Sequence, residues 1–248
     1  MRWVRQELSD NVLTLVLDRP ESLNAFNEEM LVSLGNGLEY ARQDSIRVVV
    51  LRGEGTSFCA GADVSAILGE RDRDRARETL ESLAGILRQI GALPKPVIAA
   101  FQGHAAGGGA ELVLEADLRL AATDAQLWLP DVSVGSSPTT LWQLTRLVGH
   151  GVAAEMAMLG RRLGADELLT RGVVHKVVDP AALATSAAEL AARLCDDFGS
   201  RSLRHAKEAL RLAAEVDRET DLRMNIELML DCFATAEQEE AIERFTDR

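Results

Sequence analysis

Residues 96–112, PVIAAFQGHAAGGGAEL, hold the pattern that decides the fold class. They predict a buried apolar strand at 97–101, then a glycine turn at 107–109, then an apolar helix with Glu111 in its first turn. A turn without Cβ atoms lets the backbone approach a ligand closely. Free N–H groups at the start of a helix favour negative charge. The stretch therefore predicts an oxyanion-binding site with an acid or base beside it.

A second segment, FCAGAD at 58–63, has a similar design. It follows an apolar strand at 47–51, as the glycine turn follows the strand at 97–101, and it also leads towards a helix. N–H groups from two such turns can converge on one carbonyl oxygen, and losing one donor of this kind typically costs roughly 10²–10³ in rate. Glu111 and Asp131 supply carboxylates near this site. Two carboxylates beside an oxyanion site suit proton transfer next to a thioester carbonyl.

Strand and helix signals alternate through the first part of the chain. Alternating apolar residues predict a hairpin over 2–17, helical spacing predicts a helix over 27–43, and the region 150–171 is predicted to be helical throughout. The later residues give only helical signals, and no Pro-, Gly- or Ser-rich linker separates them from the rest. We therefore expect an α/β core at 1–178 and a docked or swapped helical region at 179–248. The recurring strand-plus-helix units suggest a stacked, coiled arrangement.

Composition narrows the function classes. The chain has 248 residues, 47% of them hydrophobic, and a net charge of −12, as expected of a soluble globular protein whose charge opposes binding to nucleic acid or anionic membranes. It shows no signal-peptide pattern and no apolar run of spanning length, so we expect a cytoplasmic protein with no membrane partner. Cys59, Cys195 and Cys232 are odd in number and widely spaced, which favours reduced thiols over a disulfide or a metal site.

Four motifs occur in the order expected of one known family. They are LDRPESLNA at 17–25, FCAGAD at 58–63, KPVIAA at 95–100 with the glycines that follow it, and LTRLVG at 144–149. In these motifs the chain resembles the enoyl-CoA hydratase/isomerase (crotonase) superfamily over nearly its full length. The resemblance implies a crotonase-like spiral of ββα units and a C-terminal helical region for trimerisation and pocket closure. It also implies an acyl-CoA thioester substrate, a homotrimer or dimer of trimers, and no metal or other cofactor.

The resemblance also assigns residues to roles. Ala62 and Gly108 match the two residues whose N–H groups hold the thioester oxygen in the family. Glu111 matches the first catalytic glutamate of the hydratases, and Asp131 stands where their second glutamate stands. In hydratases these carboxylates position and activate the water that adds across the 2,3 double bond. The CoA and substrate contacts are expected at Ser22, Leu23, Ala60, Asp63 and Phe233, with Arg248 as a further C-terminal candidate.

Several positions depart from the family pattern. Asp131 is one methylene shorter than a glutamate, and Thr139 stands where some isomerases carry a catalytic glutamate. Trp128 and Trp142 are candidates for the acyl pocket, although tryptophans more often belong to the core. His104 is expected to pack locally. The leading interpretation is hydration of a 2-enoyl-CoA or the reverse dehydration. Two alternatives stay open: isomerisation or C–C bond chemistry with one carboxylate, and a catalytically weak acyl-CoA-binding subunit.

Overall fold

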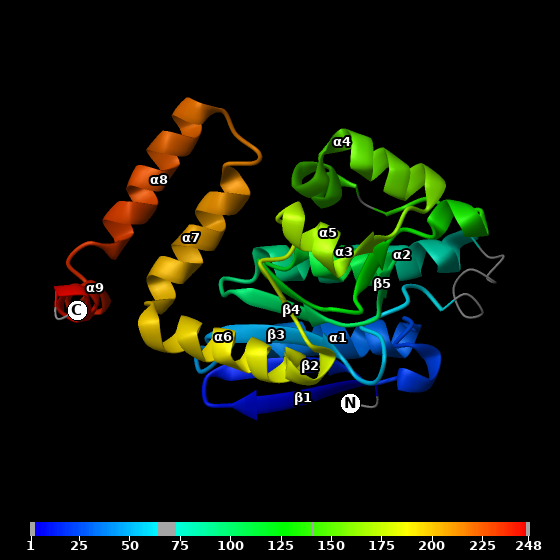
Figure 1. Ribbon diagram of the computed structural model, residues 1–248. Coiled ribbons are helices and arrows are strands. Elements are labelled where there is room, and N and C mark those ends of the chain that lie inside the picture. The colour runs from blue at the N-terminus through cyan, green and yellow to red at the C-terminus, as the bar shows by residue number, and fades with distance from the viewer. Residues whose placement is uncertain (1–2, 64–72, 140, 247–248) are drawn as a thin grey trace.

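The computed structural model describes residues 3–63, 73–139 and 141–246 (Figure 1). The strands are β1 (Val4–Ser9), β2 (Val12–Leu17), β3 (Val48–Gly53), β4 (Val97–Phe101), β5 (His104–Ala106), β6 (Leu118–Ala122), β7 (Gln126–Trp128), β8 (Leu163–Gly164) and β9 (Lys176–Val178). The helices are α1 (Glu28–Tyr40), α2 (Arg73–Ala92), α3 (Gly108–Glu115), α4 (Trp142–Leu159), α5 (Ala165–Thr170), α6 (Leu183–Asp197), α7 (Ser200–Leu212), α8 (Arg218–Cys232) and α9 (Ala236–Thr246).

The strands form two layers that the chain visits in turn. The large sheet has the order β1-β2-β3-β4-β6-β9, antiparallel at β1–β2 and parallel elsewhere. The small sheet has the order β5-β7-β8, and an isolated bridge from Cys59 to Ala105 extends it. Each unit passes through the large sheet, then the second layer, then a helix, as in β4–β5–α3 and β6–β7–α4. The expected spiral of ββα units is confirmed.

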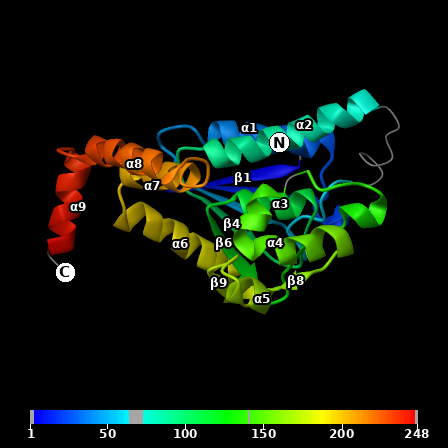
Figure 2. The ribbon, with the colours of Figure 1, turned by 90° about the horizontal axis from the view of Figure 1, so that it is seen from above.

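Both faces of the large sheet are buried, and β3 shows why. Its residues alternate between two apolar clusters, as the two-residue period of a strand requires. Val49 and Leu51 belong to the cluster that includes side chains of α1, α2 and α3, whereas Val48 and Val50 pack with α6. Figure 2 shows α1 and α2 on one side of the sheet and α6 on the other. A strand covered on both faces needs apolar residues at every position.

Two local expectations are wrong. Gly108 and Gly109 lie inside α3, and of the three glycines only Gly107 has a positive φ, at 51°. Gly109 serves close packing, because a Cβ there would lie 2.4 Å from the carbonyl oxygen of Cys59. The region 150–171 is not one helical segment, since Gly160 ends α4 at a φ of 64° and β8 then pairs with β7 before α5 begins.

The C-terminal helices leave the core after α6 (Figures 1 and 2). One buried polar anchor holds α7, because the Lys207 Nζ lies 2.8 Å from Asp117 Oδ2 and donates to the carbonyls of Ile90 and Lys95. Further along, α8 runs back along α7, and neither α8 nor α9 has a buried residue. Within the described ranges, no helix combines the length and apolar character needed to cross a bilayer.

Candidate active site

The structure brings the two predicted turns into contact. A Cβ atom at Gly61 would lie 2.7 Å from the carbonyl oxygen of Ala106, and one at Gly107 would lie 3.9 Å from the Cα of Gly61. Gly61 and Gly107 are buried, while the next residue in each turn, Ala62 or Gly108, keeps partial exposure. The peptide groups of Ala62 and Gly108, from segments about 45 residues apart in sequence, therefore lie side by side near the surface.

Hydrogen bonds on one side of the 61–63 segment orient the Ala62 amide. The Phe26 amide donates to the Gly61 carbonyl at 2.7 Å, and the Asp63 amide donates to the Phe26 carbonyl at 2.9 Å. Phe26 and Ala62 form a parallel bridge, in which the N–H of Ala62 points away from Phe26. The Gly108 N–H lies in the first turn of α3, where amides have no acceptor within the helix. Both donors suit a carbonyl oxygen.

Cys59 supports this arrangement from beneath. The Gly61 amide donates to the Cys59 Sγ at 3.4 Å, and the Cys59 backbone pairs with β5 through the His104 carbonyl and the Ala106 amide. Burial raises the pKa of the Cys59 thiol to about 12, so it stays protonated and unreactive at neutral pH. The sequence identified Cys59 only as a reduced core thiol and gave no sign of this contact.

Glu111 lies in the first turn of α3 and is 3% exposed. Its Oε1 accepts a hydrogen bond from the Thr139 amide at 3.0 Å, and its own amide donates to the Gly107 carbonyl. The carboxylate is therefore held at the glycine turn and fixed in orientation by the 131–139 segment. Thr139 stands where some isomerases carry a catalytic glutamate. Here its backbone amide contributes to the site instead.

Asp131 borders the same turn from the other side. It begins a short 3-10 helix, Asp131–Val134, directly after Pro130. Its Oδ2 lies 4.0 Å from where a Cβ would stand on Gly107, and this buried oxygen has no hydrogen-bond partner among the described residues. Burial raises the pKa of Asp131 above its ordinary value. The geometry thus places Ala62, Gly108, Glu111 and Asp131 around one turn.

The expected CoA-contact residues of the first motif form a rigid loop beside this turn. Asn24 is buried and organises the loop, since its Oδ1 accepts from the Arg19 amide and its Nδ2 donates to the carbonyls of Glu54 and Ser57, all at 2.8 Å. The Ala60 amide donates to the Leu23 carbonyl at 2.9 Å, which joins the loop to the FCAGAD segment. The sequence motif includes Asn24 but gives no sign that its side chain holds the loop together.

Asp63 has a positioning contact within the protein. Its Oδ2 lies 2.7 Å from the Arg19 Nη1, and both side chains are mostly buried. Arg19 also donates to the Ala25 carbonyl. The pair joins the loop that contains Ser22 to the segment that contains Ala62. The structure therefore brings Ser22, Leu23, Ala60 and Asp63 together.

Phe233 is not brought to this site within one chain. It ends α8 and is exposed, and both views place α8 well away from α3 (Figures 1 and 2). Arg248, the other C-terminal candidate, lies outside the described residues.

A cavity of about 570 Å³ is lined in part by Thr139, whose amide donates to Glu111. Its lining comes from α2, the start of α4 and the end of α7, and it includes Thr139 and Leu87. Leu87 stands one helical turn beyond Leu83, whose side chain would lie 3.0 Å from a Cβ on Gly108. Trp142 also lines the cavity and is 43% exposed, so it does not belong to the core.

Trp128 lies partly buried at the end of β7. The Arg162 guanidinium lies 3.9 Å from its ring centroid, and the His104 ring packs against it edge-on at 6.4 Å. His104 therefore packs locally, as expected. Across the described ranges, no group of three or more His, Cys, Asp or Glu side chains could hold a metal ion.

Known proteins match this chain along almost its entire length. The sequence profile of the enoyl-CoA hydratase/isomerase family matches residues 7–248. A short-chain-enoyl-CoA hydratase of Clostridium acetobutylicum is 32% identical over 98% of this chain and 94% of its own. A crotonyl-CoA hydratase of Syntrophomonas wolfei is 31% identical over 98% and 94%. The crystal structure of an enoyl-CoA hydratase from Bacillus anthracis superposes with a TM-score of 0.94 at 31% identity, covering 99% of this chain and 96% of that one.

The chain therefore belongs to the enoyl-CoA hydratase/isomerase family and has the crotonase fold. It is an enzyme of that family, and the hydratase names among its relatives point to a lyase.

Proposed function

We propose that this chain adds water across the 2,3 double bond of an enoyl-CoA thioester and catalyses the reverse dehydration. The observation that supports this most is the meeting of two outward amides and two carboxylates at the Gly107 turn. Relatives named for short-chain enoyl-CoA and crotonyl-CoA hydration support the same reaction. The adjoining cavity of about 570 Å³ is our candidate for the acyl chain.

The proposed mechanism starts with the thioester oxygen between the Ala62 and Gly108 amides. These donors stabilise the negative charge that forms on the oxygen as C2 and the carbonyl become an enolate. Glu111 takes a proton from water while the water oxygen bonds to C3, and the same proton then goes to C2. Asp131 orients the water. All atoms come from water and substrate: a C–O bond forms at C3, the C2–C3 π bond is lost, and the water proton ends on C2, so the proposal invokes no metal or redox cofactor.

The environments of the two carboxylates support different roles. Glu111 is fixed by the Thr139 amide, which suits a group that must exchange one proton with a defined partner. Asp131 has a buried oxygen without a hydrogen-bond partner among the described residues, and that oxygen is available to accept from water. Because aspartate is one methylene shorter than glutamate, its reach depends on the backbone of the Asp131–Val134 turn.

We also propose that the active form is a homotrimer or a dimer of trimers, with the second copy as the partner of the C-terminal helices. Large apolar side chains lie exposed on α8 and α9, namely Leu222, Ile226, Met229, Leu230, Ile242 and Phe245. A monomer gains nothing by exposing so many of them. In such an assembly Phe233 would contact CoA bound to a neighbouring subunit. The free thiols of all three cysteines fit a cytoplasmic location.

The test is the loss of absorbance of the conjugated thioester when purified protein meets crotonyl-CoA. We expect Glu111→Gln to lower kcat by roughly 10²–10⁴, the usual contribution of a general acid–base group. Glu39→Gln is the matched control, because it makes the same chemical change on the exposed face of α1.

A wild-type protein that binds crotonyl-CoA without turning it over would contradict hydration. It would favour isomerisation, C–C bond chemistry or binding alone. Activity that survives Asp131→Asn unchanged would leave water activation to Glu111 by itself.

A further inference from the structure

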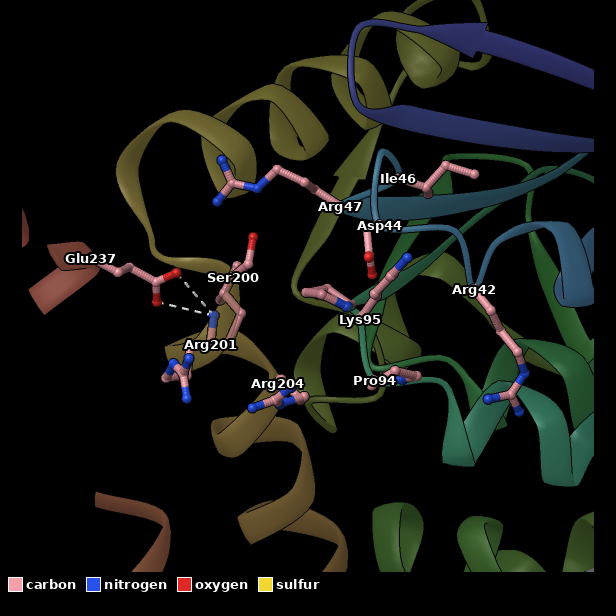
Figure 3. A pocket seen from close by; sticks show the side chains of 12 residues that line it. Arg42, Asp44, Ile46, Arg47, Pro94, Lys95, Ser200, Arg201, Arg204 and Glu237 are labelled. Carbon is pink, nitrogen blue, oxygen red and sulfur yellow. Dashed lines mark hydrogen bonds between the residues drawn. The ribbon is translucent and has the colours of Figure 1, made fainter. Parts of the chain in front are cut away.

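A second cavity, of about 290 Å³, lies where β3 and β4 begin (Figure 3). The Gly107 turn lies beyond the opposite end of β4. The cavity is bounded by the segments that precede β3 and β4, by the start of α7 and by Glu237 of α9. Five cationic side chains line it, and they are Arg42, Arg47, Lys95, Arg201 and Arg204. Asp44 and Glu237 are the carboxylates of the lining. Such a gathering of positive charge contrasts with the net charge of −12 of the whole chain.

The two cations nearest the sheet, Lys95 and Arg47, form their hydrogen bonds with backbone carbonyls. Lys95 donates to the carbonyls of Ala41 and Gln43, and Arg47 donates to those of Cys195 and Phe198. The carbonyls of Ala41, Gln43 and Phe198 follow the ends of α1 and α6, and that of Cys195 lies in the last turn of α6. Both cations therefore also offset the negative ends of helix dipoles. Across the described ranges neither lies within 4.0 Å of a carboxylate oxygen, and the Arg47 Nε is buried without a hydrogen-bond partner.

The arginines at the rim are only partly neutralised. Arg201 and Arg204 share one carboxylate oxygen, Asp231 Oδ2, at 2.8 and 3.6 Å, and the His205 ring contacts the same oxygen at 2.7 Å. Both arginines remain partly exposed at the mouth of the cavity. A guanidinium in this state can bind a further oxyanion with paired hydrogen bonds.

An internal anion already occupies part of this site. The Glu237 carboxylate accepts from the Arg201 amide at 3.0 Å (Figure 3) and from the Ser202 amide at 3.3 Å, and both amides are first-turn donors of α7. Glu237 comes from α9, so this contact holds the last helix against α7. A free anion that enters the cavity would compete with Glu237 for the same amides.

We propose that this cavity binds a phosphate-type anion, either inorganic phosphate or the phosphate of a small phosphomonoester, and that Glu237 is its internal competitor. Three kinds of group would bind the anion: the rim guanidinium groups of Arg201 and Arg204, the Lys95 ammonium, and the first-turn amides of α7. Binding would release Glu237 and loosen α9. The proposal is independent of the hydratase reaction, because the residues proposed for that reaction follow β3 and β4, whereas this cavity lies where the two strands begin.

The experiment is calorimetric titration of the full-length protein with inorganic phosphate and, separately, with phenyl phosphate, at constant ionic strength. We expect saturable binding, and whichever probe binds more tightly identifies the form of the ligand. Arg204→Gln should weaken binding about threefold to tenfold, as expected for one charge-assisted contact at a partly exposed site. Arg193→Gln is the matched control, because it removes the same charge from an exposed position on α6 outside the cavity.

The decisive variant is Glu237→Gln. It removes the competing charge, so it should bind phosphate about threefold to tenfold more tightly, a gain that a folding defect cannot produce. Three results would overturn the proposal: no saturable binding of either probe, equal effects of Arg204→Gln and Arg193→Gln, or no tighter binding by Glu237→Gln.

Discussion

The core and the C-terminal helices of this protein are held in place in different ways. In the core, the Ala62 and Gly108 turns follow strands that are buried on both faces, and each is fixed by backbone hydrogen bonds. The C-terminal helices depend on a few polar anchors, above all Lys207 and Glu237, and α8 and α9 bury no side chain. Under our proposal, one chain therefore supplies the whole geometry of the candidate site, whereas a partner subunit would fix the position of α8 and α9.

The largest expected effect on stability comes from breaking the anchor of α7. Lys207→Met leaves the Asp117 carboxylate and two backbone carbonyls partly buried without their cation. We expect a loss of about 3–5 kcal/mol in the free energy of unfolding, the usual cost of removing one partner of a buried pair. Chemical denaturation measures it. Arg193→Gln, which breaks an exposed pair with Asp197, should cost less than about 1 kcal/mol. Equal losses would contradict the anchoring role.

The next effect tests the close contact between Gly109 and Cys59 beside the Gly107 turn. A Cβ at position 109 would meet the Cys59 carbonyl at 2.4 Å, so Gly109→Ala should lower the free energy of unfolding by about 1–3 kcal/mol and shift the Gly108 amide. Gly85→Ala is the control, since its Cβ meets only the tip of Arg88 at 4.0 Å within α2. That change should stabilise the protein by up to about 1 kcal/mol. An unchanged free energy of unfolding in Gly109→Ala would contradict this and show that the turn tolerates displacement.

The pH dependence of kcat/KM tests Asp131. Because burial raises its pKa above the ordinary 3.8, Asp131 is ionised only above that raised value. If the carboxylate orients water, activity falls as the pH drops through the raised pKa, which gives an acid limb displaced to higher pH than an exposed aspartate would give. Asp131→Asn should lower the plateau and remove this limb. An identical limb in the variant would assign it to another group.

The smallest effect on the stability of a single chain is expected for α9. Phe245 is 81% exposed on α9, so Phe245→Ser should change the free energy of unfolding of a subunit by less than about 0.5 kcal/mol. The same change should weaken self-association, measured by sedimentation velocity across a concentration series. Unchanged association would remove Phe245 from the proposed interface, and a wild-type monomer at all concentrations would reject the interface itself.

Much of the core could be predicted from sequence because its signals are local. The fully apolar, β-branched segment at Val48–Leu51 is typical of a strand buried on both faces, and the order of the motifs is enough to predict Glu111 and Asp131 near one turn. What failed was the detail at Gly108 and Gly109. A sequence does not distinguish a glycine that is needed for close packing, as Gly109 is against Cys59, from a glycine that is needed for a turn. Only the tertiary contact shows which role the glycine has.

Other features had no local signal at all. The Lys207–Asp117 pair joins residues 90 positions apart, and the bond from the Thr139 amide to Glu111 depends on a backbone group that every residue type carries. The last helices, α8 and α9, could be predicted as helical, but their position could not be predicted. Their sequence shows which side chains are apolar, whereas their packing depends on the surfaces that they contact.

The most direct test of the central claim is the infrared carbonyl frequency of crotonyl-CoA bound to Glu111→Gln, in which turnover is too slow to remove the ligand. If the Ala62 and Gly108 amides hold the thioester oxygen, the bound carbonyl band moves to lower frequency than in free crotonyl-CoA, because hydrogen bonding polarises the C=O bond. A band at the frequency of the free thioester, with binding verified in the same sample, would contradict the oxyanion site and the mechanism built on it.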